Sequence, residues 1–257
     1  MTKTKPALRT IAIVAAALFA LVTPIVQALT GTIGVDESEF VREGQNTLRA
    51  AGYAFAIWTL IYAWLVGYAA YQALPSTRET PGLRMLGLPS VVAMAGCGLW
   101  LIAQSQNAKW ATVAIIVLSA AVLYVPLLQR YPVQHRIEYW LVAAPLSLLA
   151  GWLTVASAIN ALTVLTGLGV ITPQSAPAWA AGGIVLVVMA AGALTLRSKN
   201  WIYPLPVAWG LAAVSVAERM DKPMISLLAG AGALLVLVAG TWVGTHRAIL
   251  LPNPRQQ

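Results

Sequence analysis

The chain has 257 residues, of which only 9% are charged (16 Lys and Arg, 8 Asp and Glu) while 59% are hydrophobic. Soluble globular proteins average about 25% charged and roughly 45–50% apolar residues, and a water-soluble domain of this size needs more polar surface than this sequence supplies. The composition therefore excludes soluble enzymes, disordered chains and nucleic-acid-binding domains, and it predicts an integral membrane protein.

Apolar segments of membrane-spanning length fill most of the chain. A spanning helix needs about 20 mainly apolar residues, because the hydrocarbon core is about 30 Å thick and each residue rises about 1.5 Å. Counted in this way, the sequence predicts an all-α membrane protein with eight spans and no extramembrane domain. In chain order the spans are residues 8–30, 51–74, 85–103, 110–128, 138–165, 179–196, 201–217 and 224–244.

Charges between these segments alternate from one side to the other. The termini and every second loop carry 11 basic and 2 acidic residues, whereas the opposite loops carry 5 basic and 6 acidic residues. Cytoplasmic loops hold the excess of Lys and Arg. The net charge of +8 therefore reports topology rather than nucleic-acid binding. It predicts an even number of spans with both termini cytoplasmic, in a membrane that we expect to be a bacterial inner membrane.

The first 30 residues admit a second interpretation. A basic start, an apolar run from Ile11 to Val22 and the stretch 26–28 are also features of a cleaved signal peptide. The apolar run extends to about 20 residues, longer than the usual signal core, which favours a first spanning helix. Cleavage after residue 28 would leave seven spans with an outside N-terminus and unchanged orientation.

The first outer loop, residues 31–50, is the only long one and contains Asp36, Glu37 and Glu39. Two interpretations are open. The loop is either a solvated acidic cap, as is usual on the non-cytoplasmic side, or a lid over a cavity, since long loops in compact domains tend to be functional.

Ionisable side chains are absent from the middle of the predicted spans. Glu138 and Glu218 lie at span ends, and His135 and His246 lie in cytoplasmic flanks. Charges buried in hydrocarbon mark ion and proton pathways, so their absence disfavours proton-coupled transport. The single cysteine, Cys97, rules out a disulfide framework or a cysteine-based metal site within one chain. We therefore expect a protein that is not an enzyme and holds no metal.

Aromatic and amide side chains gather instead at the outer ends of the second to fifth spans. Phe55, Trp58 and Tyr62 recur at i, i+3 and i+7, so they share one helix face. Flat rings stack on a planar apolar ligand, and a few amides orient its polar edge. The candidate ligand-binding residues are Tyr53, Phe55, Trp58, Tyr62, Asn107, Trp110, Trp152 and Asn160.

Three motifs containing these residues resemble the TspO/translocator family, whose members are also called tryptophan-rich sensory proteins. Residues 51–62 resemble the second-helix signature of the family, residues 107–110 its L-N-x-x-W motif, and residues 145–160 its fifth-helix motif. The three occur in the family's order and spacing. The match is closer to the longer members of the family than to the minimal five-helix proteins, which have a Trp in the loop where Tyr53 stands.

The resemblance implies a TspO-like five-helix bundle over residues 1–165 and a three-helix transmembrane extension over residues 166–257. It implies a cavity beneath the first loop that binds a tetrapyrrole (protoporphyrin IX or haem) or a sterol-like lipid. It further implies that no cofactor is required and that the protein is often a homodimer, with a binding or signalling role.

Two other functions remain open at this point. The chain is also long enough for a small-molecule transporter or exporter, although the lack of charges within its spans argues against ion coupling. A third interpretation is a structural or assembly subunit of a larger membrane complex, because small residues at 228–235 and 240–244 suit close helix packing.

Overall fold

The computed structural model describes residues 6–31, 44–77, 81–130 and 136–250, and every regular element in these ranges is helical. The predicted all-α fold is therefore confirmed. The long helices are α1 (Pro6–Thr30), α3 (Ile57–Ala73), α4 (Pro81–Ser105), α5 (Lys109–Leu128), α7 (Ala144–Gly167), α8 (Ala176–Ser198), α9 (Pro204–Glu218) and α10 (Pro223–Leu250). The short ones are η1 (Gly52–Ala56), η2 (Pro75–Thr77), α6 (Arg136–Glu138) and the π-helical turn η3 (Tyr139–Ala143), which joins α6 to α7.

Seven helices in the described ranges are long and apolar enough to cross a membrane. The exception is the segment predicted as the seventh span, whose helix α9 has 15 residues. The helix begins at Pro204 because Asn200 folds the residues before it into a turn. The side-chain Oδ1 of Asn200 accepts hydrogen bonds from the backbone N–H groups of Ile202 and Tyr203, at 3.0 and 3.1 Å. The multi-span prediction is thus confirmed for seven helices, and α9 is an additional short apolar helix.

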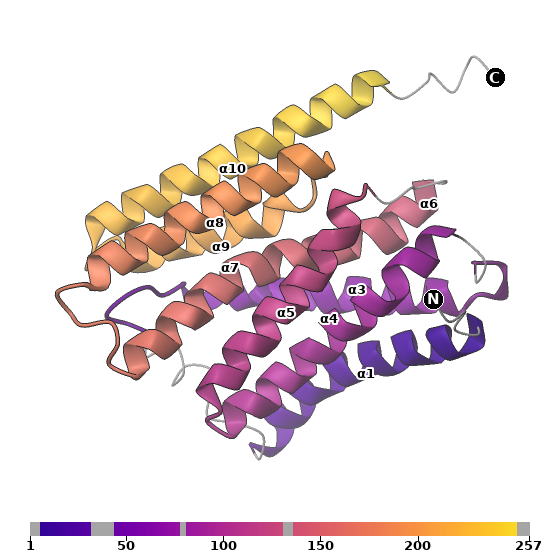
Figure 1. Cartoon of the computed structure of the whole chain (residues 1–257), viewed down its shortest axis with the longest axis horizontal. Coiled ribbons are helices and arrows are strands. Elements are labelled where there is room, and N and C mark those ends of the chain that lie inside the picture. Colours follow the sequence, from indigo (N-terminus) through magenta and orange to yellow (C-terminus); the bar gives the residue numbers. More distant parts are fainter. Residues whose placement is uncertain (1–5, 32–43, 78–80, 131–135, 251–257) are drawn as a thin grey trace.

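Helix α7 separates two groups of helices. Figure 1 shows α1, α3, α4 and α5 on one side of α7, and α8, α9 and α10 on the other. Both faces of α7 are packed, so every residue from Ala144 to Val155 is buried. At Gly151 the approach to α9 is close enough that a Cβ atom would lie 2.1 Å from the carbonyl oxygen of Tyr203. Only glycine fits this contact.

The turns that follow α4, α7 and α9 lie at one end of the bundle together with residues 44–51. Helix α1 begins and α10 ends at the opposite end (Figure 1). We call the end with residues 44–51, 106–108, 168–175 and 219–222 the outer end, because the charge pattern predicts that it faces away from the cytoplasm. The orientation itself stays a prediction.

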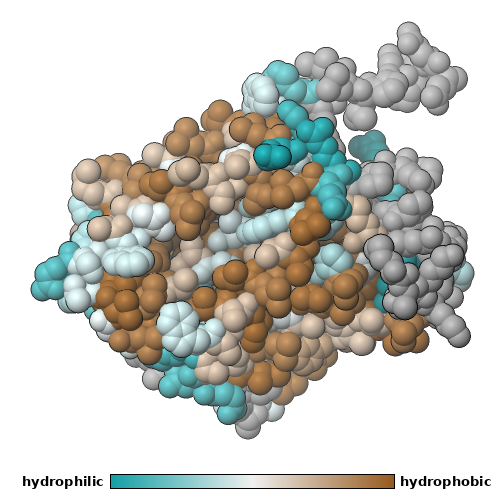
Figure 2. Space-filling view, in the orientation of Figure 1, coloured by the Kyte–Doolittle hydropathy of each residue, from teal (hydrophilic) through white to brown (hydrophobic). Residues whose placement is uncertain are grey.

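Large apolar side chains cover the outside of the bundle. Leu88, Met189 and Leu227 are each about two-thirds exposed or more, and Figure 2 shows hydrophobic residues over much of the visible face. In water such a surface would drive association. A lipid bilayer solvates it instead, in agreement with the membrane class predicted from composition.

A chain of hydroxyl groups links the two groups of helices through α7. The Thr154 hydroxyl donates to the carbonyl oxygen of Ala150 at 2.8 Å, and it lies 2.8 Å from Tyr124 Oη and 2.9 Å from Tyr203 Oη. A hydroxyl has one hydrogen and two lone pairs. Because its hydrogen is used within α7, both tyrosines donate to Thr154, which thereby joins α5, α7 and the start of α9.

Replacing Thr154 by valine, which keeps the side-chain shape, removes the acceptor of both tyrosine hydroxyls. We expect the free energy of unfolding in mixed micelles to fall by about 1–2 kcal/mol, the upper range for hydrogen bonds within membrane proteins. Thr241→Val is the control, because the exposed Thr241 hydroxyl bonds only within its own helix, to Val238. Equal stability of Thr154→Val and the unaltered protein would show that the hydroxyl chain contributes nothing.

Candidate functional site

A cavity of about 90 Å³ lies toward the outer end of the bundle, between α3, α4, α5 and α7. Ala50, which precedes η1, and Phe55, which lies within η1, form part of the cavity wall. Its aromatic lining consists of Phe55, Trp58, Trp100 and Trp152. The other lining residues are small, aliphatic or uncharged polar, so no charged side chain lines this cavity in the described part of the chain.

Trp152 is the centre of the aromatic wall. Its ring, only 4% exposed, packs edge-to-face with Phe55 at a centroid distance of 6.2 Å and with Trp58 at 6.1 Å. Trp58 in turn stacks on Tyr62, with a centroid distance of 5.1 Å and an interplanar angle of 19°. Edge-to-face and stacked pairs are the favoured aromatic arrangements. The wall is therefore a set of mutually fixed rings from η1, α3 and α7.

Asn160, two turns beyond Trp152 on α7, ties three helices together. Its side-chain oxygen accepts the indole N–H of Trp100 at 3.2 Å, and its amide nitrogen donates to Thr112 Oγ1 at 3.1 Å. An Asn within a span needs such partners, and here the protein supplies them from α4 and α5. The amide is thus a structural link that also lines the cavity.

The remaining polar groups of the lining differ in whether they have partners. The Cys97 thiol donates to the carbonyl oxygen of Ala93, and the Ser119 hydroxyl donates to that of Ile115, both within their own helices. The buried indole Nε1–H of Trp152, in contrast, has no hydrogen-bond partner among the residues that the structure describes. A buried donor without a partner costs free energy, so an acceptor on a bound molecule would be stabilised here.

The structure brings together four of the eight candidate residues around the cavity: Phe55, Trp58, Trp152 and Asn160. Tyr62 lies directly behind Trp58. Tyr53 is 46% exposed and packs instead against Trp209 of α9, with ring centroids 5.4 Å apart.

Asn107 and Trp110 lie at the turn between α4 and α5, outside the cavity lining. Asn107 adopts a left-handed conformation with φ of 52°, which suits Asn at the end of a helix. Trp110 is 60% exposed. A role for these two residues in ligand binding stays a prediction.

Sequence reasoning missed the contribution of α4. Cys97 and Trp100 line the cavity, and Gln104 follows them at i+7 on the same helix face. This spacing could have identified the face. A single Trp without aromatic neighbours on its own helix gives a weak signal, however, and the bond of Trp100 to Asn160 joins helices that are far apart in the sequence.

The predicted first outer loop is described only from residue 44 onward, and its acidic residues Asp36, Glu37 and Glu39 lie outside the described residues. The described part, residues 44–51, contributes Ala50 to the cavity wall. This part of the loop therefore lies against the cavity, and both interpretations of the loop stay open.

These features define a multi-span helical membrane protein with an uncharged aromatic cavity near one end of its helices. The chain belongs to the TSPO-like protein family, whose model matches residues 10–242. The match extends beyond the predicted five-helix unit and covers most of the predicted extension. A search of curated proteins and a search of solved structures each found no match.

Proposed function

We propose that the protein is a TspO-type binding and sensory protein that holds a hydrophobic planar ligand in the aromatic cavity. The observation that carries this proposal is the convergence of Phe55, Trp58 and Trp152 on one uncharged cavity. Binding rather than catalysis is favoured, because the lining contributed by the described residues offers neither a carboxylate nor an imidazole. Its one thiol, Cys97, is hydrogen-bonded within its helix.

The ligand class is a tetrapyrrole, such as protoporphyrin IX or haem, or a sterol-like lipid, bound as a ligand and not as a required cofactor. Pockets for drug-sized ligands measure roughly 300–1,000 Å³, more than the 90 Å³ of this cavity. A ligand of either class therefore enters only if part of the wall moves outward. The bilayer supplies the route for such a ligand, and a homodimer is the proposed assembly.

The test is a titration of the detergent-purified protein with protoporphyrin IX, followed by the absorbance of the porphyrin. We expect Trp58→Leu and Trp152→Leu each to weaken binding about tenfold, because an aromatic contact contributes up to about 1.5 kcal/mol beyond its area. Trp242→Leu is the control, since Trp242 is 47% exposed on α10. Binding that is unchanged in both cavity variants would contradict the proposal.

The same titration separates the two ligand classes. Competition between a sterol and the porphyrin would indicate that the two ligand classes share one cavity. Porphyrin binding that a sterol leaves unchanged would favour the tetrapyrrole as the ligand class. The dimethyl ester of protoporphyrin IX lacks the two carboxylates of the parent porphyrin. Because the lining carries no charge, we expect the ester to bind at least as tightly as the acid.

A further inference from the structure

Residues 44–51 lie across the outer end of the cavity and against α7. Ala50 lines the cavity. Gly44 lies so close to cavity-lining Thr163 that a Cβ atom there would be 2.5 Å from Thr163 Oγ1. The hydroxyl groups of Thr47 and Thr166 are 2.7 Å apart and hydrogen-bonded. This segment therefore covers the outer end of the cavity and is joined to α7 by few contacts.

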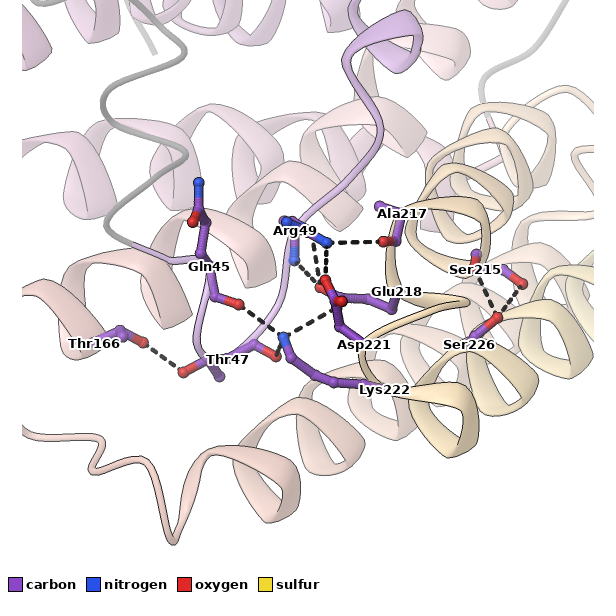
Figure 3. A network of polar contacts seen from close by, with 10 residues as sticks. All are labelled: Gln45, Thr47, Arg49, Thr166, Ser215, Ala217, Glu218, Asp221, Lys222 and Ser226. Atoms are coloured by element: carbon purple, nitrogen blue, oxygen red, sulfur yellow. Dashed lines mark hydrogen bonds and ion pairs between the residues drawn. The ribbon is translucent and has the colours of Figure 1, made fainter.

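Stronger contacts join the same segment to the end of α9, and they converge on Glu218 (Figure 3). The carboxylate of Glu218 is fully buried, and its Oε1 accepts the backbone N–H of Arg49 at 2.9 Å. Its Oε2 lies 3.0 Å from Lys222 Nζ. That ammonium group also donates to the carbonyl oxygens of Gln45 and Thr47, at 2.8 and 3.1 Å. One buried carboxylate thus holds residues 45–49 directly and through Lys222.

The Arg49 side chain adds a second, more exposed set of contacts. Its guanidinium donates to the carbonyl oxygen of Ala217 at 3.1 Å and pairs with Asp221. The Asp221 side chain is 62% exposed, in contrast to that of Glu218. Further along, the backbone N–H of Ala51 donates to the carbonyl oxygen of Ala213 in α9 at 3.1 Å. The cavity cover is therefore attached mainly to the helices after α7.

We propose that Glu218 is a positioning residue that keeps residues 44–51 closed over the cavity, so that the α9–α10 hairpin acts as a latch on ligand entry. Two cations pair with this carboxylate, Arg49 of the cover and Lys222 of the hairpin, and Arg49 also pairs with Asp221. Salt screens the exposed Asp221 pair more than the buried Glu218 pair. The role of the latch in ligand entry rests on the proposed function, but the closure of residues 44–51 over the cavity does not.

Cys97 provides a built-in reporter of closure, because it is the only cysteine of the chain and it lines the cavity at 7% exposure. The rate of its alkylation by N-ethylmaleimide, an uncharged reagent, measures how often the cavity opens. In Glu218→Gln, which keeps the side-chain shape and removes the charge, we expect this rate to rise about tenfold, equivalent to about 1.4 kcal/mol. In Asp221→Asn we expect less than a threefold rise.

Ser226→Ala is the matched control within the same hairpin. The Ser226 hydroxyl joins α10 to α9 through Ser215 and makes no bond to residues 44–51 (Figure 3). Its loss tests whether any loosening of the hairpin exposes Cys97. We expect the alkylation rate of this variant to match that of the unaltered protein when each is measured at the same interval below its own unfolding temperature.

A second variant locks the cover shut without touching Glu218. Thr47→Cys and Thr166→Cys place two thiols where hydroxyl groups now form a 2.7 Å hydrogen bond, and a disulfide needs Cβ atoms about 3.5–4.5 Å apart. We expect the oxidised form to react at Cys97 about tenfold more slowly than the unaltered protein. Reduction with dithiothreitol should restore the original rate at Cys97, resolved by peptide mass analysis.

Two results would overturn the proposal. One is an alkylation rate of Cys97 that neither Glu218→Gln nor the oxidised disulfide changes. The other is a rise in Ser226→Ala as large as that in Glu218→Gln, which would show general loosening of the hairpin. The alkylation assay needs no ligand. If Cys97 responds as expected but porphyrin and sterol do not bind, the proposed function fails while the latch is supported.

Discussion

Replacing Gly151 by alanine is expected to lower the free energy of unfolding by about 3 kcal/mol, the upper part of the range for overpacking a core. The added Cβ atom would lie 2.1 Å from the carbonyl oxygen of Tyr203 and 2.6 Å from Pro206 Cγ. A backbone carbonyl and a proline ring cannot rotate away, so α7 and α9 must separate. The usual gain of about 1 kcal/mol from alanine over glycine within a helix does not offset this cost.

The measurement is unfolding in mixed micelles, followed by tryptophan fluorescence. Gly192→Ala in α8 is the control, because nothing lies within 4 Å of its added Cβ atom, and we expect that variant to be equally stable or slightly more stable. A Gly151→Ala variant as stable as Gly192→Ala would show that α9 does not pack against α7 as described. Because α9 carries Glu218, the separation should also raise the alkylation rate of Cys97.

Replacing Asn160 by leucine is expected to cost about 2–3 kcal/mol of stability and to weaken ligand binding about tenfold. The leucine cannot accept the indole N–H of Trp100 or donate to Thr112, and leaving a buried donor without its acceptor costs about 1–3 kcal/mol. Trp100 would then shift within the cavity wall. The decisive measurements are unfolding in micelles and porphyrin titration of the same preparation.

Ser157→Ala is the control for this change. Ser157 lies one turn before Asn160 on α7, and in the described part of the chain its buried hydroxyl oxygen has no hydrogen-bond partner. Its removal is therefore expected to be neutral or slightly stabilising. Should Asn160→Leu behave in the same way as Ser157→Ala, the amide would not be the link between α4, α5 and α7 that its contacts indicate.

Hydropathy was sufficient to predict the helical architecture, for a physical reason. In lipid every backbone polar group must be satisfied internally, so an apolar run of sufficient length forms a helix. The error concerned α9, because Trp201, Ile202 and Tyr203 count as apolar residues although Asn200 folds them into a turn. Hydropathy reflects only that these side chains are apolar, and it does not show that the backbone N–H groups of Ile202 and Tyr203 bond to the Asn200 side chain.

The sequence indicated part of the cavity lining where one helix face carries the signal. Phe55 and Trp58 share a face by spacing alone, and both line the cavity. Trp110 also belongs to a family-like motif, yet it is 60% exposed. Which face of α5 turns inward depends on its packing against α4 and α7, and a single sequence does not contain this rotation.

Glu218 shows a second limit of the sequence. The sequence shows only an acidic residue at the end of a predicted span, which is the usual place for a solvated charge. Its partner Arg49 is 169 positions away along the chain, and the carboxylate is fully buried only because residues 44–51 fold over the end of α9. Long-range pairing of this kind is invisible without coordinates.

The contact at Gly151 also determines how the cavity can deform. Gly151 and Trp152 are consecutive on α7. Trp152 lines the cavity, and the neighbouring Gly151 packs against the backbone of Tyr203. That wall cannot recede when a molecule pushes on the indole ring. The cover at the outer end of the cavity, residues 44–51, is instead a loop. If the cavity binds the proposed ligand, we therefore expect it to expand on the side of this loop, while Trp152 keeps its place on α7.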